Sequence, residues 1–523
     1  MATGNPIEID PEQLSVNVPR KLRKEVVLSQ DTTNLVPYRG ALAAREGWGT
    51  VWALTDSIIG QMAFKSSAGQ FLLISATTVS VFLSTSPYTG ASINLKGSNS
   101  ALTAANTQRA VFSPLLNSAT PGFVMTNNTD PPIAWKVGDI QWTVLSAAPA
   151  KARCCATVTL GVAGNVVMLG NTTESLVNYP SRIRWSSLND HTTWPVASYA
   201  DLLATADSIV AIRAFNRLSV AIYKDSSIWV ATAQPGTSAA SFAFEIVDRT
   251  NGPIGPGAIC DGPYNTHIYL GRDGILYRFD GSAAVPVARL SDLNGFSFDS
   301  AHTENNCILY DRYRSRFYGV AWALSSNTTI SGLVSISSGS IAGLVQISSG
   351  TITGLVVVGN VCTGFVVMES SGKIFPVSFG TRQIRSLVNL ADVAANNNAA
   401  GMDTAICVDQ AVVDGSSTTL AIVSKLELPI SPTEVYEFDG IEYLFDEYAG
   451  ADVVTVTVFY GPDIDHTQQA VIWNAPVQAA SSLLVRSVNL QGRYLAVQLS
   501  MSASSRIWIR KINLWAWGRR LYA

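Results

Sequence analysis

The sequence predicts an all-β protein, and three observations support this prediction. Charged residues make up only 14% of the 523 residues, so long helices held by salt bridges are not expected to dominate. Segments of alternating apolar and polar residues, bounded by turn residues, recur along the chain and are typical of β-hairpins. Few windows have apolar residues at helical spacing, and the best of them, residues 195–212, is short.

The first 50 residues show little periodicity and are expected to form an N-terminal arm. They contain a basic cluster at Arg20, Lys21, Arg23 and Lys24. Termini are rarely ordered unless other elements hold them. The arm is therefore either a solvated extension or a segment that docks on a neighbouring subunit or an upper ring.

Residues 51–400 contain six strand-turn-strand units, which predict a six-bladed β-propeller-like domain with insertions. Radial repetition of sheets would protect the strand edges that a chain so rich in β-branched residues otherwise exposes. The spacing is unequal, and the longest gap, residues 85–153, has further strands near 133–145. The six units are residues 71–84, 154–169, 211–231, 266–279, 307–322 and 362–379.

Two of these units are the best defined hairpins. Residues 217–231 alternate apolar residues around a polar break at residues 224–227. Residues 268–279 repeat this plan, with Asp273 and Gly274 in the turn, because Asp-Gly readily adopts the positive φ that a tight turn needs.

Residues 329–358 contain a tighter repeat with a period of 11 residues, which places Gly332, Gly343 and Gly354 in register. The repeat is expected to be an insertion, either a meander of short strands or an uncharged β loop at a tip of the molecule that meets another surface. Its apolar runs are far shorter than the ~20 residues of a membrane-spanning helix, so no stable membrane insertion is expected.

Residues 417–523 predict a separate β-sandwich-like module. Strands are expected at residues 418–428, 453–460, 470–474, 482–488, 494–501 and 506–517, at intervals typical of sandwiches. The aromatic residues of the last strand belong either to the core or to an interface. An acidic run lies near the start of the module and is ordinarily a solvated face; it consists of Glu427, Glu434, Glu437, Asp439, Glu442, Asp446 and Glu447.

A set of residues between about 180 and 320 carries a resemblance to a known family. The set begins with an Arg-Ile-x-Trp-Ser motif and ends with an Asp-Gly hairpin followed by Phe-Asp-Gly. Its members are Arg182, Trp185, Trp194, Asp248, Arg249, Gly252, Gly257, Asp273 and Gly274. In this order and spacing the chain resembles the tail nozzle or tail-hub proteins of short-tailed bacteriophages.

The resemblance implies a structural virion protein that is assembled in the bacterial cytoplasm and resides in the virion tail. It implies a homo-hexameric ring below the portal and adaptor proteins, with tail fibres or spikes attached outside and double-stranded DNA passing through a central channel. In such a protein an uncharged β loop at residues 329–358 would meet the host envelope or a fibre. The channel wall is expected to be neutral to acidic, because cationic side chains would bind the phosphates. The acidic run is the candidate for part of that wall, with a solvated outer face as the alternative.

Catalysis and cofactor binding are not expected. The four histidines lack metal-ligand spacing, and no nucleophile elbow or phosphate-binding loop occurs. The six cysteines lack C-x-x-C spacing and are expected to be free thiols. The net charge of −3 gives no global attraction to nucleic acid. The alternative function is a propeller-based module that recognises a host receptor or glycan.

Overall fold

A computed structural model shows the fold of the chain. The residues that it describes are 7–9, 27–28, 35–38, 41–44, 47–66, 69–86, 91–115, 120–160, 164–215, 218–234, 241–249, 252–290, 298–312, 314–323, 328–332, 345–348, 351–356, 361–368, 373–377, 383–392, 396–402, 405–410, 420–428, 434–447, 453–463, 467–476, 482–503 and 508–520. Within these ranges the chain is built from β-strands and one short 3₁₀ helix, η4 (Ser300–Asn305). The all-β prediction is confirmed.

Seven four-stranded antiparallel sheets occur in the described part of residues 47–410. Sheet 1 contains β6 (Ile58–Lys65), β7 (Phe71–Thr77), β8 (Val81–Thr85) and β9 (Ile93–Asn94). Sheet 2 contains β10 (Val111–Leu115), β11 (Gly122–Thr126), β12 (Ile133–Lys136) and β13 (Thr143–Val144). Sheet 3 contains β14 (Lys151–Thr159), β15 (Asn165–Glu174), β16 (Val177–Trp185) and β17 (Tyr199–Asp201).

The next three sheets follow the same plan. Sheet 4 contains β18 (Ile209–Ala214), β19 (Ser219–Lys224), β20 (Ile228–Ala233) and β21 (Phe242–Asp248). Sheet 5 contains β22 (Ile259–Asp261), β23 (His267–Leu270), β24 (Ile275–Phe279) and β25 (Ala284–Arg289). Sheet 6 contains β26 (Cys307–Asp311), β27 (Arg316–Ala323), β31 (Val361–Met368) and β32 (Ile374–Val377).

Sheet 7 combines two distant parts of the sequence. It contains β33 (Ile384–Asp392), β34 (Asn396–Met402), β35 (Ala405–Gln410) and, as its fourth strand, β5 (Gly47–Ala53). β5 runs antiparallel to β35, with Ala53 opposite Ala405 and Gly47 opposite Gln410. Because sheet 1 follows β5 directly in the sequence, this pairing brings the first and last sheets together.

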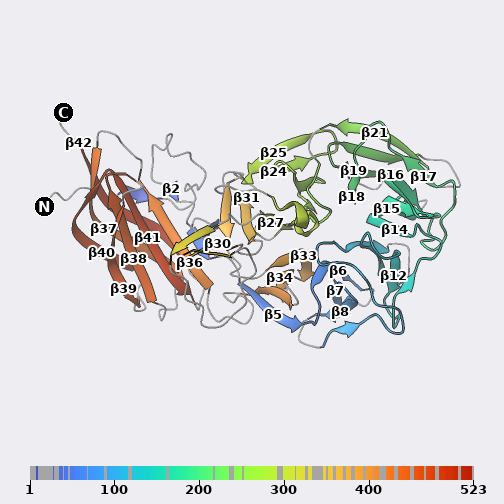
Figure 1. Cartoon of the computed structure of the whole chain (residues 1–523), viewed down its shortest axis with the longest axis horizontal. Coiled ribbons are helices and arrows are strands. Elements are labelled where there is room, and N and C mark those ends of the chain that lie inside the picture. Colours follow the sequence, from blue (N-terminus) through green and yellow to red (C-terminus); the bar gives the residue numbers. More distant parts are fainter. Residues whose placement is uncertain are drawn as a thin grey trace.

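The sheets are arranged in a ring, with β5 and β6 beside β33 and β34 (Figure 1). The first strands of successive sheets lie next to one another, and a buried apolar cluster fills the space between each pair of neighbouring sheets. Between sheets 7 and 1, for example, Leu390 packs with Ile58 and Leu73. This arrangement is consistent with a β-propeller-like fold.

The prediction of six blades is not confirmed, because the described residues form seven four-stranded sheets around the ring. Two of the six predicted units, residues 307–322 and 362–379, contribute to the same sheet, since an insertion separates its two halves. The gap at residues 85–153 contains sheet 2. No predicted unit covers sheet 7, because β33, β34 and β35 follow the last predicted unit and β5 precedes the first.

The 11-residue repeat lies in the insertion of sheet 6. Its described residues form a three-stranded antiparallel sheet of β28 (Thr328–Gly332), β29 (Val345–Ser348) and β30 (Thr351–Val356), in the order β28-β30-β29. Ile330 is opposite Gly354 and Gly332 is opposite Ile352. Gly343 lies outside the described residues.

Two further sheets contain the C-terminal strands. The six-stranded sheet, called sheet 8, contains β1 (Ile7–Ile9), β3 (Leu35–Tyr38), β4 (Ala41–Ala44), β37 (Glu434–Glu447), β40 (Ser482–Gly492) and β42 (Trp508–Arg520). The five-stranded sheet, called sheet 9, contains β2 (Val27–Leu28), β36 (Leu420–Glu427), β38 (Val453–Gly461), β39 (Gln468–Pro476) and β41 (Tyr494–Ala503).

The described strands of the first 50 residues therefore belong to these sheets and to sheet 7. β1 and β4 pair with β42, and β2 pairs with β36. The basic cluster at Arg20, Lys21, Arg23 and Lys24 lies outside the described residues. The N-terminal segment thus contributes strands to the C-terminal module, a role that its weak periodicity does not predict.

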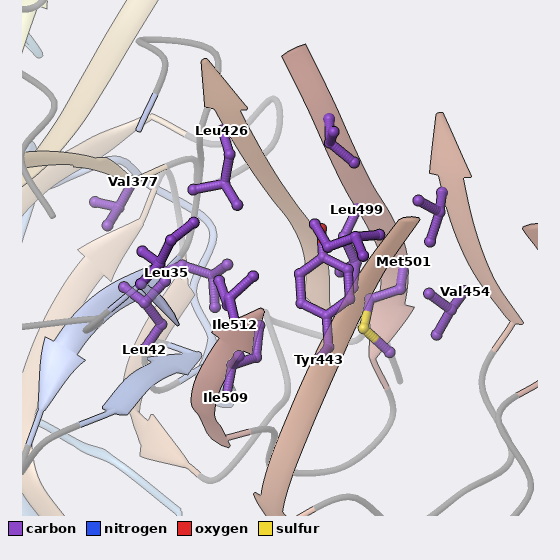
Figure 2. Close-up of a cluster of buried hydrophobic side chains, with 14 of the residues drawn as sticks. Leu35, Leu42, Val377, Leu426, Tyr443, Val454, Leu499, Met501, Ile509 and Ile512 are labelled. Carbon is purple, nitrogen blue, oxygen red and sulfur yellow. The ribbon is translucent and has the colours of Figure 1, made fainter. Parts of the chain in front are cut away.

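One apolar cluster joins sheets 8 and 9 and extends to sheet 6. Figure 2 shows Leu35 and Leu42 between Val377 of sheet 6 and Ile509 and Ile512 of β42. Tyr443, Val454, Leu499 and Met501 continue the cluster between the two sheets. The strands from the start of the chain therefore pack where the C-terminal module meets the ring.

Candidate functional site

The residues that carry the family resemblance lie in sheets 3 to 5. Arg182 is held on β16 by an ion pair and two aromatic rings. Its Nε and Nη2 each donate to a carboxylate oxygen of Asp201 at 2.7 Å. Its guanidinium carbon lies 3.6 Å from the ring centre of Tyr179 and 4.4 Å from that of Tyr199. The Asp201 carboxylate raises the pKa of Arg182. These contacts fix β17, the outermost strand of sheet 3, against β16.

The two tryptophans pack on opposite sides of sheet 3. Trp185 is 6% exposed, and its ring lies edge-on to Phe242 of sheet 4 at a centroid distance of 5.3 Å. Trp194 belongs to the cluster between sheets 2 and 3, and its Nε1 donates to the carbonyl oxygen of His191 at 2.9 Å. Each tryptophan therefore joins sheet 3 to one of its neighbours.

The two glycines of this set lie where backbone or side chains approach too closely for a Cβ atom. A Cβ on Gly252 would lie 1.7 Å from the carbonyl oxygen of Lys224, and one on Gly257 would lie 2.5 Å from Cζ of Arg109. Asp248 accepts a hydrogen bond from the backbone of Ala284 at 2.8 Å. Gly252 and Gly257 thus let the segment that leads into sheet 5 approach sheets 4 and 2, and Asp248 of sheet 4 bonds β25 of sheet 5.

The Asp-Gly turn between β23 and β24 has the predicted conformation. Gly274 has a φ of +75°. Asp273 accepts hydrogen bonds from the Ile275 backbone at 3.1 Å and from the Tyr277 hydroxyl at 2.6 Å. Arg249, the last member of the set, is exposed. Most residues that carry the family resemblance therefore connect neighbouring strands or sheets of the ring.

Four arginines from four different sheets lie on or directly before first strands. Two of them make the same contact with the next sheet. Arg153 of β14 donates to the carbonyl oxygen of Ile209 at 3.3 Å, and Arg213 of β18 donates to that of Ile259 at 3.0 Å. Ile209 and Ile259 are the first residues of β18 and β22. Each of these arginines therefore ties one sheet to its successor.

The other two arginines, Arg109 and Arg385, connect sheets 2 and 7. Arg109 donates to the carbonyl oxygen of Arg385, and Arg385 donates to that of Asn106 at 2.6 Å. Burial lowers the pKa of Arg109, and the nearby Arg213 adds to this effect. Both side chains are buried, which is costly for a cation unless hydrogen bonds compensate it.

The helix η4 crosses from sheet 6 toward these arginines. Glu304 forms an ion pair with Arg153 of sheet 3, and Asn305 donates to the carbonyl oxygen of Asn106 at 3.1 Å. Because sheets 3 and 6 are not neighbours in the ring, these contacts reach across its centre. The middle of the ring therefore holds side chains and η4.

The structure separates the predicted acidic run. Glu427 lies on sheet 9, is 1% exposed and accepts a hydrogen bond from the Tyr494 hydroxyl at 3.2 Å. The other members lie on β37 of sheet 8. The side chains of Glu434, Asp446 and Glu447 lie outside the described part.

Glu437, Asp439 and Glu442 are the part of the run that stays together. They alternate along β37 with the buried residues Phe438 and Ile441, and a register shift at Phe438/Gly440 preserves this alternation. The same side of the sheet also carries cations. Asp439 pairs with Arg486 at 2.7 Å, and Lys511 pairs with Glu8 at 2.9 Å. This face is mixed in charge, and we call it the β37 face.

The described thiols are buried and free. They are Cys154, Cys155, Cys260 and Cys307. Burial raises the pKa of Cys307 to about 11 and that of Cys155 to about 12, so neither is ionised at neutral pH. Among the described residues no group of three or more His, Cys, Asp or Glu is placed to hold a metal ion.

One buried charge pair was not predicted from the sequence. Lys224, fully buried on β19, lies 2.9 Å from a carboxylate oxygen of Asp207. The sequence assigned Lys224 to a polar hairpin turn, where a solvated side chain is expected. Its partner, Asp207, lies 17 residues earlier in the sequence, and the two residues meet only once sheet 4 has formed. No local sequence pattern therefore indicates this pair.

Comparisons with known proteins give no relative: no family model matches the chain, and no curated protein matches it. No helix in the described part is long and apolar enough to cross a membrane.

Proposed function

We propose that the chain is a structural protein of a short-tailed bacteriophage virion, the subunit of the tail nozzle or hub ring. Six copies would surround a channel for DNA ejection below the portal and adaptor proteins, and the outer surface would hold tail fibres or spikes. The chain would assemble in the bacterial cytoplasm and reside in the tail.

One observation carries this proposal. The residues on which the resemblance rests serve as joints between neighbouring sheets: Trp185 between sheets 3 and 4, Trp194 between sheets 2 and 3, and Arg182 within sheet 3. Residues that fix the geometry of a rigid scaffold suit a protein whose role lies in its surfaces and its assembly.

We further infer that the ring of sheets is a seven-bladed propeller closed by β5, and that sheets 8 and 9 form a sandwich. In such an architecture a channel for duplex DNA runs between subunits. The axis of each propeller is too crowded for it, because η4 and the arginines of four sheets occupy that region.

The β37 face is our candidate for part of the channel wall. Carboxylates that face the axis repel the duplex and keep it centred within the ~8 Å reach of charge at physiological salt. Replacing Glu437, Asp439 and Glu442 with Lys should leave the ring assembled. The exposed Asp439–Arg486 pair contributes at most about 1 kcal/mol, so its loss alone does not unfold the sheet.

Two measurements test the proposal. Electron microscopy of the purified chain should show rings of six-fold symmetry; a chain that stays monomeric at micromolar concentration would contradict it. In virions carrying the triple Lys variant, dye-detected genome release should be slow at low salt and recover as salt rises.

A control separates position from charge. Glu245→Lys makes the same kind of charge reversal on β21, at an exposed position of the ring. It should release DNA at the normal rate. Normal release by the triple variant at low salt would remove the β37 face from the channel but leave the hexamer proposal standing.

A further inference from the structure

A cavity of about 560 Å³ opens between sheets 5 and 6. It lies where the β22–β23 turn, the end of β24 and the β26–β27 turn meet. Its floor is apolar and includes Ile268 and Phe317, while Thr266, Arg278, Asp280 and Ser315 supply polar groups. A cavity of this size with an apolar floor and a few converging polar groups is typical of small-ligand sites.

Tyr264 stands at the rim of this cavity in a strained conformation. Its side chain is 93% exposed, so it contributes almost nothing to the core. Tyr264 and the next residue, Asn265, both have a φ of +56°. That region of the backbone is unfavourable for a residue such as tyrosine, and strained residues of this kind gather at binding sites. The turn therefore holds an aromatic ring out in solvent beside the cavity.

Arg278 offers unused hydrogen-bond donors to the same space. It is exposed on β24, opposite Ile268 of β23. Its guanidinium forms no hydrogen bond or ion pair with any residue in the described ranges. A guanidinium carries five N–H donors in a fixed planar geometry, so Arg278 can bind a ligand with two parallel hydrogen bonds.

Asp280 supplies the complementary acceptor. Its Oδ1 accepts hydrogen bonds from the Ser282 backbone at 2.9 Å, the Ser282 hydroxyl at 2.7 Å and the Ala283 backbone at 3.2 Å. These contacts hold the carboxylate in place at the end of β24. Its second oxygen, Oδ2, makes no hydrogen bond with a described residue, and Asp280 lines the cavity together with Arg278.

We propose that this cavity is a carbohydrate-binding site that holds one or two pyranose units. The flat Tyr264 ring stacks on the apolar face of a sugar, while Arg278 donates to and Asp280 accepts from its hydroxyl groups. Sugar hydroxyls both donate and accept hydrogen bonds, which matches this pair. A phosphate ligand fits less well, because the carboxylate of Asp280 repels it. The inference does not depend on the proposed tail function.

Binding by the full-length protein tests the proposal. The probes are an array of bacterial-type pyranose oligosaccharides, followed by calorimetric titration with the tightest di- to tetrasaccharide. Tyr264→Ala and Arg278→Gln should each weaken binding at least 10-fold. Tyr264→Phe retains the ring and should bind within about 3-fold of the unmodified protein.

Arg289→Gln is the matched control. Arg289 is exposed on β25 of the same sheet and does not line the cavity, so its replacement removes the same charge and should leave binding unchanged. Tyr264→Gly relieves the backbone strain and should raise the melting temperature while abolishing sugar binding. A purely structural tyrosine would not give this opposite pair of effects.

Three results would overturn the proposal. They are the absence of saturable binding to any sugar on the array, sugar binding that survives both Tyr264→Ala and Arg278→Gln, and a loss of sugar affinity in Arg289→Gln as large as that in Arg278→Gln. Microscopy of the same preparations separates this question from assembly, because rings that form without binding sugar reject the site alone. Sugar binding by a protein that forms no ring rejects the hexamer alone.

Discussion

Replacing Lys224 with Met tests how the interior of sheet 4 is held together. The Lys224 ammonium group is fully buried and lies 2.9 Å from Asp207 Oδ1. It also donates to the carbonyl oxygens of Leu202 at 2.9 Å and Thr205 at 2.8 Å, and to the Thr205 hydroxyl at 2.8 Å. One side chain thus holds the segment between β17 and β18 against β19.

The magnitude follows from what the substitution leaves behind. Methionine fills a similar volume but leaves the Asp207 carboxylate without its cation, and removing one partner of a buried pair costs about 3–5 kcal/mol. Asp207 Oδ2 keeps its hydrogen bonds from Ser226 and Ser227, which places the expected loss near the lower end, about 3 kcal/mol. The double variant with Asp207→Asn should lose less than the sum of the single losses, because it leaves no unpaired charge.

Urea denaturation at several pH values provides the assay. Burial alone would raise the pKa of Asp207, but hydrogen bonds from Thr205, Lys224 and Ser226 outweigh burial and hold that pKa well below its usual range. A carboxylate whose pKa is lowered on folding stabilises the protein above its unfolded pKa of about 3.9 and loses this contribution as the pH falls further. The cost of Lys224→Met should therefore be full at pH 7 and shrink below about pH 4. A loss under about 1 kcal/mol at pH 7 would refute the reasoning.

Three other substitutions give further tests. Trp185→Ala should lower the free energy of unfolding by about 3–5 kcal/mol in urea denaturation, because it leaves a cavity between sheets 3 and 4. A stable, assembled variant that lost only a specific activity would contradict the structural role of Trp185. Gly252→Ala should cost about 3 kcal/mol, since its Cβ would meet the Lys224 carbonyl oxygen, and an unchanged denaturation midpoint would show that the segment can shift. Burial lowers the pKa of His267 to about 4, so the free energy of unfolding should fall by about 1.4 kcal/mol per pH unit as the pH falls from about 6.5 to 4. His267→Gln should abolish this pH dependence. A variant with the same pH dependence would show that another group causes it.

Local patterns predicted the hairpins of the ring well. The alternation in residues 217–231 corresponds to β19 and β20, and the Asp273-Gly274 turn lies between β23 and β24 as expected. Both depend on neighbours in sequence, through side-chain alternation and turn chemistry. In the C-terminal module each predicted strand likewise overlaps an observed one.

What the sequence did not predict depends on long-range pairing. β37 was read as an acidic run, although its apolar residues Phe438, Ile441, Tyr443 and Phe445 give it a buried face. The six predicted units include no strand of sheet 2 or sheet 7, and two of them belong to sheet 6; in sheet 7 the fourth strand, β5, comes from far away in the sequence. The cavity beside Tyr264 arises where two separate turns and the end of β24 meet, and no local motif connects these three segments.

The pairing of β5 with β35 has a consequence for how the chain folds. Gly47–Ala53 must wait for Ala405–Gln410, and Ile7–Ile9 must wait for β42, which begins at Trp508. During synthesis at roughly 5–20 residues per second, the N-terminal strands spend tens of seconds without their partners. Contacts so distant in sequence also slow the final search, since loop closure must precede any gain from pairing. We therefore expect slow folding, with unpaired strand edges that are prone to aggregate until β42 has emerged from the ribosome.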